Sequence, residues 1–443
     1  MREIGVIICN YNKEDYIINC IRTVLESSIQ NFDVYVVDNA STDHSVERIR
    51  DEFGDKITLM VNSENLGGSG GFNTGLREAL KHEYKYLMLF DNDIVVDQHA
   101  IEELYQFLET HEEVGMVGSK VYFMDYPDRI WGYGSRIDFE QYVQVDNYKN
   151  CTDSDSIPET LYCDYVAACS LMARTEAVKK VGIMPEENFI YWDDMEWGYR
   201  FNEAGYKVAV YGKSKIWHKA GGRNAGNTFI NYYMWRNRIR FFLKVLPKDK
   251  REHFAETILS DMFRLIYSCN LKGETNIVTS VMYAFDDAVH GVAGKAPDYK
   301  ILTRNGSGDR LTYAVGEAKS VLIKFSGHFE GLGNIVRKLE GRGTVETISI
   351  GMIDCPELTE EVKAQFPNCH VVSEYEPEQY DFHMRMCDHI FKVGAGANPD
   401  TYVDPWCNII NGKEDLAYCS NYNNTREIFL LCMKPLIFMN MDN

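Results

Sequence analysis

The first hundred residues alternate between short apolar runs of β-strand character and segments with helical spacing. The run "IGVIICNY" at 4–11 is β-branched and apolar, and "KEDYIINCIRTVLES" at 13–27 follows with helical periodicity. The alternation continues to "YKYLMLFDND" at 84–93, an apolar strand that ends in acids. Strands that alternate with helices indicate an α/β fold, with a largely parallel sheet covered on both faces. The expected elements between these runs are strands at 33–41 and 57–63 and helices at 43–53 and 71–82.

Polar side chains stand at the ends of all four expected strands. Ligands of such sheets bind in the crevice outside the carboxyl ends of the strands. The sequence therefore predicts a binding site at this edge of the sheet. The residues at these ends are Asn10 and Asn12, Asp38 and Asn39, Asn62 and Asn65, and Asp91 and Asp93.

The sequence Asp91-Asn92-Asp93 directly follows the apolar run "YLMLF". Two carboxylates one residue apart can bind a hard divalent cation, and that cation can hold a diphosphate. An isolated Asp-x-Asp is more often an ordinary polar strand exit. The three earlier strand ends with polar tips favour the metal site here.

Two further motifs of this region each allow a ligand-binding and a local explanation. Asp38 could accept a hydrogen bond from a base or a ribose, or form a turn that caps a helix starting near Thr42 or Asp43. The segment "NLGGSGGFNTG" at 65–75 is not a Walker loop and differs from G-x-G-x-x-G. Its glycines would let a backbone approach a ligand closely, and the helix start that follows favours anions. A merely flexible loop is the alternative, disfavoured because so many glycines cost folding entropy.

The stretch "FIYWDDMEW" at 189–197 places three acids inside an aromatic run. Carboxylates this close repel one another, and burial raises the cost. They either begin a solvated helix, where the dipole favours acids, or face a site that compensates their charge. His218 in "IWHKAGG" is a buried core histidine by default, and becomes a metal-ligand candidate only if the acids bind a metal.

Composition restricts the partners and the compartment. A formal net charge of −20 argues against nucleic acid, because phosphate backbones are bound by clustered lysines and arginines. The 443 residues, 45% of them hydrophobic, predict two or three globular domains. The twelve cysteines are scattered without a CxxC pair, which favours reduced thiols in the cytoplasm. We expect no secretion leader and no apolar stretch long enough to cross a bilayer.

Taken in order, these motifs resemble the family-2 inverting glycosyltransferases, closest to the bacterial galactofuranosyl- and rhamnosyltransferase branch. The resemblance covers roughly residues 3–245 and rests on a strand followed by Tyr-Asn, "VVDNASTD", "NLGGSGGFNTG", "DND", "FIYWDDMEWGYRFNEAGYKV" and "IWH". It implies a GT-A fold with a Rossmann-like mixed, mainly parallel sheet that binds a nucleotide-sugar. It also implies an Asp-x-Asp motif that holds Mn²⁺ or Mg²⁺ on the diphosphate, and a later carboxylate that acts as the base.

The same resemblance assigns roles in the transfer step. Asp194 occupies a position similar to that of the catalytic base in this family. Asp193 occupies one similar to that of a residue that orients the base or contacts the acceptor. Trp192 and Trp131 would contact the acceptor. A single displacement is implied, in which the acceptor hydroxyl loses its proton to Asp194 and attacks the anomeric carbon from the face opposite the diphosphate. Desolvation by Trp192 and Trp197 is expected to raise the pKa of this base.

The remaining implied contacts concern the donor and the metal. Asn92 occupies a position of the motif that usually tolerates variation. Glu196 stands where many relatives have Asp and receives no role. The implied metal ligands are Asp91, Asp93 and His218. The implied nucleotide-sugar contacts are Asn10, Asp38, Asn65, Gly67, Gly68, Gly70, Gly71 and Asn92.

The expected domains are a catalytic domain at 1–227, a helical extension at 228–300 and a smaller α/β domain at 301–443. The segment 294–310 is interpreted as a linker, and the glycine-rich 393–400 as a turn. The C-terminal domain could bind acceptor, form a homo-oligomer or be a degraded second catalytic domain. The aromatic and basic helix at 232–250 either contacts a membrane peripherally, on the inner face of the plasma membrane, or packs on the catalytic domain.

The predicted function is transfer of galactofuranose from its UDP donor, or of rhamnose from its dTDP donor, to a glycan or lipid-linked glycan acceptor. Synthesis of cell-surface polysaccharide is the expected setting. The alternatives are a hexopyranosyltransferase of the same family and a non-catalytic nucleotide- or glycan-binding protein. A nucleotidyltransferase is disfavoured, because no basic signature for a triphosphate is present.

Overall fold

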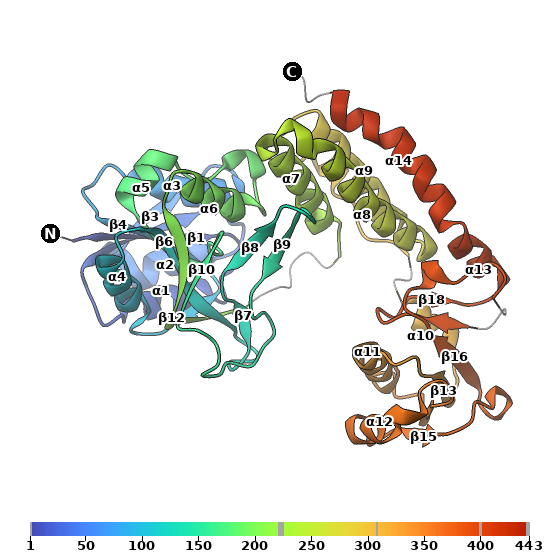
Figure 1. Ribbon diagram of the computed structural model, residues 1–443. Coiled ribbons are helices and arrows are strands. Elements are labelled where there is room, and N and C mark those ends of the chain that lie inside the picture. The colour runs from blue at the N-terminus through green and yellow to red at the C-terminus, as the bar shows by residue number, and fades with distance from the viewer. Residues whose placement is uncertain (1, 220–225, 307–308, 398–400, 440–443) are drawn as a thin grey trace. The chain divides into compact units, whose positions relative to one another are not determined.

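The computed structural model describes residues 2–219, 226–306, 309–397 and 401–439 (Figure 1). The chain forms two compact units. The first comprises Met1–Ile258 and Ser280–Leu302, and the second comprises Leu259–Thr279 and Thr303–Asp442. The predicted boundaries after residues 227 and 300 stay predictions.

A mixed sheet forms the centre of the first unit. Its main strands, in spatial order, are β10 (Thr160–Cys163), β12 (Lys207–His218), β6 (Val114–Phe123), β11 (Ser170–Arg174), β4 (Tyr86–Asp91), β1 (Ile4–Asn10), β2 (Phe32–Asp38) and β3 (Thr58–Val61). Strand β5 (Ile94–Val96) pairs with β12, and β7 (Ile130–Gly132) pairs with β6. Strands β1 to β4 are parallel to their neighbours among themselves, whereas β11 runs antiparallel between β4 and β6.

Helices cover both faces of this sheet (Figure 1). Alternate residues of β1 enter opposite cores, with Val6 and Ile8 on one face and Ile7 on the other. Burial on both faces explains why these strands are continuous apolar runs. One face is covered by α1 (Ile17–Leu25), α2 (Ser45–Phe53) and α4 (Ala100–Thr110), and the other by α3 (Gly67–Ala79), α5 (Thr175–Val181) and α6 (Asp193–Glu203).

A hairpin and three long helices complete the region up to residue 289. The hairpin pairs β8 (Ser135–Asp138) with β9 (Val143–Asp146). Helix α7 buries aromatic and polar side chains alike, as expected for a helix packed within the first unit. The helices are α7 (Phe229–Val245), α8 (Arg251–Leu271) and α9 (Thr275–Val289).

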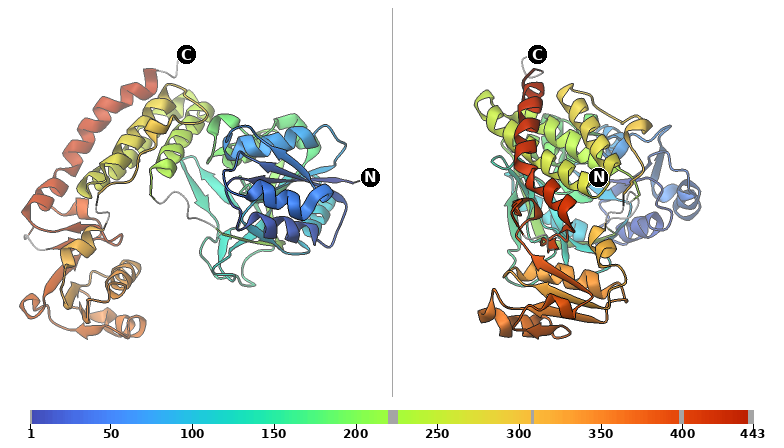
Figure 2. Two further views of the ribbon diagram at one scale, coloured as in Figure 1. Left: turned by 180° about the vertical axis from the view of Figure 1, so that it is seen from behind. Right: turned by 90° about the vertical axis from the view of Figure 1, so that its right-hand side faces the viewer.

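The second unit is the smaller α/β body that the sequence predicts. Its sheet order is β15 (His370–Val372), β14 (Thr347–Gly351), β13 (Ser320–Lys324), β16 (Phe382–Met386), β17 (Tyr402–Val403) and β18 (Ile409–Ile410), parallel except for the last pair. Its helices include α10 (Arg310–Val315), α11 (Phe329–Glu340), α12 (Thr359–Gln365), α13 (Lys413–Ser420) and α14 (Tyr422–Met439). Helix α14 lies alongside the second half of α8, where Phe263 contacts Tyr422 and Phe429 (Figure 2).

The predicted α/β fold class, with a helical segment and a smaller C-terminal unit, is confirmed. None of the helices among the described residues combines the length and apolarity needed to cross a bilayer. Residues 398–400 of the glycine-rich turn predicted at 393–400 lie outside the described residues.

Candidate active site

Sheet register brings the predicted strand-end residues to one edge. Asn10 lies opposite Asp38 in the β1–β2 pair, and Cys9 lies opposite Asp91 in the β1–β4 pair. Strand β12 runs antiparallel to β5 and ends with His218 opposite Ile94. This pairing places His218 beside the Asp91–Asp93 turn, far from it in sequence.

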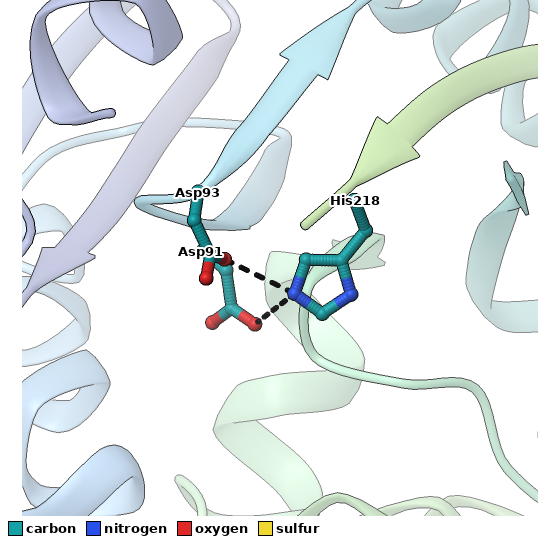
Figure 3. A group of neighbouring side chains, drawn as sticks. All are labelled: Asp91, Asp93 and His218. Atoms are coloured by element: carbon teal, nitrogen blue, oxygen red, sulfur yellow. Dashed lines mark ion pairs between the residues drawn. The ribbon is translucent and has the colours of Figure 1, made fainter. Parts of the chain in front are cut away.

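Asp91, Asp93 and His218 form a cluster with suitable atoms for a cation (Figure 3). The His218 Nε2 atom lies 3.0 Å from Asp93 Oδ1 and 3.8 Å from Asp91 Oδ2. One ligand atom from each residue lies within 4.8 Å of the others. Two carboxylate oxygens and one imidazole nitrogen are a donor set that suits Mn²⁺ and also Mg²⁺. These three residues could therefore hold a divalent cation.

The charges in this cluster are already partly compensated. The Lys13 ammonium lies 2.5 Å from Asp93 Oδ2. Burial alone would raise the pKa of Asp93, but the hydrogen bonds from His218 and Lys13 lower it overall. Burial raises the pKa of Asp91 to about 6, although nearby His218 opposes the shift. Asp93 is thus held ionised, whereas Asp91 has only the His218 imidazole nearby, at the longer distance of 3.8 Å.

Two cavities meet at this cluster. The larger, of about 750 Å³, is lined by Lys13, Asn39, Asn65 and Asn92 and, from the segment 295–301, by Lys295, Ala296, Asp298 and Ile301. The smaller, of about 410 Å³, is lined by both aspartates of the 193–194 pair. Volumes of this size suit small-molecule ligands. The residues shared by both cavities are Gly68, Phe72, Asp91, Ile190 and His218.

The glycine-rich segment is helical rather than a loop. Helix α3 begins at Gly67, four residues before the predicted start at 71, and Gly67 has φ +79°. A Cβ atom at Gly67 would lie 2.0 Å from the carbonyl oxygen of Phe189, and one at Gly71 would lie 2.3 Å from Cys9 Sγ. A Cβ at Gly70 would likewise lie 2.6 Å from Leu66 Cβ. These glycines permit close packing within the protein.

Gly68 differs from its neighbours in α3. A Cβ atom there would meet nothing nearer than Asp193 Oδ2 at 3.7 Å. Gly68 also lines both cavities, so the first turn of α3 forms an open part of their wall. Unsatisfied N–H groups and the dipole make a helix N-terminus favourable for anions.

Asn10 and Asp38 are fully buried below the larger cavity. Asn10 Nδ2 donates to Asp38 Oδ2 at 2.8 Å, and Asn92 Nδ2 donates to Asn10 Oδ1 at 2.8 Å. Asp38 Oδ1 accepts from the Ser41 N–H at 2.9 Å, which is the turn considered as the alternative for this residue. Their side chains support the ends of the strands, while Asn65 and Asn92 line the cavity itself.

The aspartate pair begins helix α6 after a strained loop. Phe189, Tyr191 and Trp192 have φ of +65°, +61° and +66°. Left-handed backbone at residues other than glycine costs of order 1–3 kcal/mol each and recurs at functional sites. The helix that follows starts at Asp193, so its dipole favours negative charge on the pair.

Burial gives both aspartates an unusual proton affinity. It raises the pKa of Asp194 to about 6, the direction expected beside tryptophans, although backbone N–H groups including that of Met195 lower it. Burial and the neighbouring charge of Asp194 raise the pKa of Asp193 to about 7. A carboxylate with a pKa near neutrality is suited to accept a proton at physiological pH.

The predicted acceptor contacts lie in the smaller cavity. Trp131 and Trp192 both line it with Asp194. The Trp131 ring meets the His218 ring edge-on, with 4.7 Å between centroids. Among the described residues, the buried Trp192 Nε1–H has no hydrogen-bond partner.

Sequence reasoning missed several residues at this site. Lys13 and residues from the segment 295–301 line the larger cavity, although the latter were interpreted as linker. Arg236 and Asn237 bind the loop before the aspartates. The available signals were a lysine directly after the first strand end and an Arg-Asn pair inside the apolar run "YYMWRNRIRF".

Comparison with known proteins adds an independent observation. Residues 5–173 match the family model of glycosyl transferase family 2. This part of the chain is a glycosyltransferase family 2 domain. Asp91 and Asp93 lie within the matched range, whereas the aspartate pair and His218 follow it.

Three relatives show what this chain is similar to. An uncharacterized glycosyltransferase of Haemophilus influenzae is 22% identical, over 59% of this chain and 85% of its own length. The galactofuranosyltransferase GlfT2 of Mycobacterium tuberculosis is 25% identical, over 40% of this chain and 30% of its own length. The dTDP-rhamnosyl transferase RfbF of Shigella flexneri is 24% identical, over 66% of this chain and 97% of its own length. The predicted family is confirmed, and the chain spans less than a third of the galactofuranosyltransferase.

Proposed function

We propose that this family-2 protein transfers a sugar from a nucleotide-sugar to a hydroxyl of a glycan or lipid-linked glycan, with inversion and with Mn²⁺ or Mg²⁺. One observation carries the proposal. The Asp91–Asp93–His218 cluster and the Asp193–Asp194 pair border the same smaller cavity, through Asp91 and His218 on one side and the pair on the other. A cluster of possible metal ligands and a proton acceptor that border one cavity suit a displacement at an anomeric carbon bound between them.

The donor would occupy the larger cavity. Asp91, Asp93 and His218 would hold the cation, which when bound supplies positive charge for the departing nucleotide diphosphate. Lys13 and the first turn of α3 at Gly68 add positive potential on the same side. Asn65 and Asn92 offer amide groups to the nucleotide.

The acceptor would occupy the smaller cavity. Asp194 would take the proton from the attacking hydroxyl, because its raised pKa makes it a proton acceptor near neutrality. Asp193 lies beside Gly68 and would orient the acceptor or the base. Trp192 and Trp131 would form the walls against which a sugar ring packs. Attack from this cavity on a sugar held from the other side inverts the anomeric centre.

Two relatives favour particular donors. One is a galactofuranosyltransferase and another a dTDP-rhamnosyl transferase, so UDP-galactofuranose and dTDP-rhamnose are the first donors to test. Purified protein is incubated with each donor, with and without Mn²⁺, and released nucleotide is measured. We expect release from one of these donors only with the metal. Absence of release from every donor, or release independent of metal, would refute the proposal.

A further inference from the structure

Two neighbouring residues of α7, Arg236 and Asn237, are fully buried although both are polar. Asn237 Nδ2 lies 2.8 Å from Asn188 O, 2.8 Å from Ile190 O and 2.9 Å from Tyr191 O. Arg236 Nε donates to Asn237 Oδ1 at 3.0 Å and thereby turns the amide so that its N–H groups face these carbonyls. A buried polar network whose members are all paired rigidifies its surroundings.

The loop held by this network would not keep its conformation unaided. Phe189, Tyr191 and Trp192 are left-handed, with φ between +61° and +66°. Such residues persist only where the surrounding structure over-determines the backbone. Asp193 follows Trp192 directly, so a rotation in this loop would move both carboxylates away from the smaller cavity.

Arg236 also binds a second segment. Its Nη2 donates to Asn188 O at 3.0 Å, while its Nη1 donates to Gly294 O at 2.7 Å. Lys295 and Ala296, which follow Gly294, line the larger cavity. Arg236 therefore joins the aspartate loop to a wall of the larger cavity, whereas Asn237 binds the aspartate loop and, through its oxygen, Arg236.

We infer that Arg236 and Asn237 are positioning residues of the transfer reaction, which hold the strained 188–192 loop so that Asp193 and Asp194 face the smaller cavity. The inference rests on the proposed function. It distinguishes the two residues: Asn237 sets the position of the aspartates, and Arg236 sets this and the donor-side wall together.

The test compares three variants of the full chain in the transfer assay. In Asn237→Asp, which replaces the amide donors at nearly unchanged size, kcat falls about 100-fold, because a displacement of about 1 Å has such an effect. The donor KM rises less than in Arg236→Lys, since Asn237 reaches the larger cavity only through the loop that contains Ile190. In Arg236→Lys, kcat falls and the donor KM rises as well. The control is Arg238→Lys on the same helix, since Arg238 Nε donates to Tyr142 O at 2.7 Å, in a loop whose residues 141 and 142 line neither cavity. It retains both constants.

Thermal unfolding shows whether each variant is folded, and Asn237→Ser, which keeps one donor, replaces Asn237→Asp if the latter is not. A folded Asn237 variant with kcat near the wild-type value would overturn the inference. So would an equal loss in Arg238→Lys, because the effect would then be general to the helix.

A second measurement separates this inference from the proposed function. Hydrogen–deuterium exchange of the amides at 189–195 is measured in wild-type protein and in Asn237→Ser, without substrate. We expect faster exchange in the variant and no change in Arg238→Lys. If wild-type protein transfers no sugar, the proposed function and the catalytic part of the inference fail. Unchanged exchange in Asn237→Ser would refute the inference that Asn237 holds the 188–192 loop.

Discussion

Glu196 Oε1 accepts from Lys244 Nζ at 2.5 Å, which ties the third acid of the "WDDMEW" run to helix α7. The same oxygen accepts from Arg200 Nη2 at 2.6 Å, and Asn188 Nδ2 donates to Oε2 at 3.2 Å. Burial would raise the pKa of Glu196, but the Lys244 and Arg200 hydrogen bonds lower it overall. The carboxylate of Glu196 is thus ionised, and its role is to stabilise the structure around the strained loop.

The first prediction follows from this pairing. Glu196→Gln keeps the size of the side chain but removes its charge, so the free energy of unfolding falls by about 1–3 kcal/mol. Thermal or denaturant unfolding measures the loss. Activity per folded molecule stays close to the wild-type value, and a large loss of kcat in a fully folded variant would show that Glu196 takes part in the chemistry.

A second prediction separates the two aspartates. Asp194→Asn removes the proposed base, so kcat falls about 10²–10⁴-fold, the usual contribution of general base catalysis. Asp193→Asn removes a contact, so kcat/KM for the acceptor falls about tenfold, the effect of one lost hydrogen bond. Steady-state kinetics with donor and acceptor varied in turn measures both. The reverse order of effects would assign the base to Asp193.

The pH profile gives a third prediction. Burial raises the pKa of Asp194 to about 6, and the base must be ionised to accept a proton. We therefore expect kcat at saturating Mn²⁺ to decline as the pH is lowered through about 6, and the residual activity of Asp194→Asn under the same conditions to lack this decline. A profile in which the variant keeps the wild-type acidic limb would contradict the assignment.

The metal site gives a fourth prediction, through stability. Burial raises the pKa of Asp91 to about 6, so the folded state binds a proton more tightly than the unfolded state does. This group thus stabilises the metal-free fold most at low pH, and that contribution is lost as the pH rises through about 6. Mn²⁺ binds the ionised carboxylate, so the increase in Tm caused by Mn²⁺ is larger at pH 7.5 than at pH 5.

Asp91→Asn is the control for this measurement, because it removes the titrating group and one proposed ligand. Its Tm responds weakly to Mn²⁺ at both pH values. A wild-type Tm that does not respond to Mn²⁺ or to Mg²⁺ at either pH would argue against the metal site.

A fifth prediction concerns the acceptor. Trp192→Phe keeps an aromatic side chain but removes the larger indole from the wall of the smaller cavity, so the KM for the acceptor rises about tenfold, which corresponds to about 1.4 kcal/mol of lost packing. Trp197→Phe is the matched control, since Trp197 Nε1 donates to Gly182 O at 2.9 Å within the core. The control lowers Tm and leaves the acceptor KM unchanged. Equal acceptor constants in Trp192→Phe and wild-type protein would exclude the predicted contact of Trp192 with the acceptor.

Local patterns predicted much of this fold because three of the first four strands, β1, β2 and β4, are buried on both faces. Continuous apolar runs such as 4–11 and polar residues at their ends are direct consequences of a covered parallel sheet. The first turn of α3 was harder to predict, because glycines have low helix propensity and only packing against Phe189 and Cys9 explains them.

The contributions of distant segments could not be predicted from local patterns. His218 joins Asp91 and Asp93 through the pairing of β12 with β5, and Lys13 joins them from the other side of the cluster. Arg236 and Asn237 bind backbone carbonyls of the 188–192 loop. Every residue has such a carbonyl, so the loop sequence does not indicate these contacts. The three acids of "FIYWDDMEW" differ accordingly: the aspartate pair lines the smaller cavity, whereas Glu196 binds Lys244 of helix α7.

The most direct test of the account is the anomeric configuration of the product. Wild-type protein is supplied with Mn²⁺, an acceptor and whichever nucleotide-sugar it hydrolyses or transfers, and the new linkage is identified by proton NMR. The account predicts a product inverted relative to the donor, formed by wild-type protein and not at a comparable rate by Asp194→Asn. A product that retains the donor configuration would contradict the single displacement that the cavity, the metal cluster and Asp194 together imply.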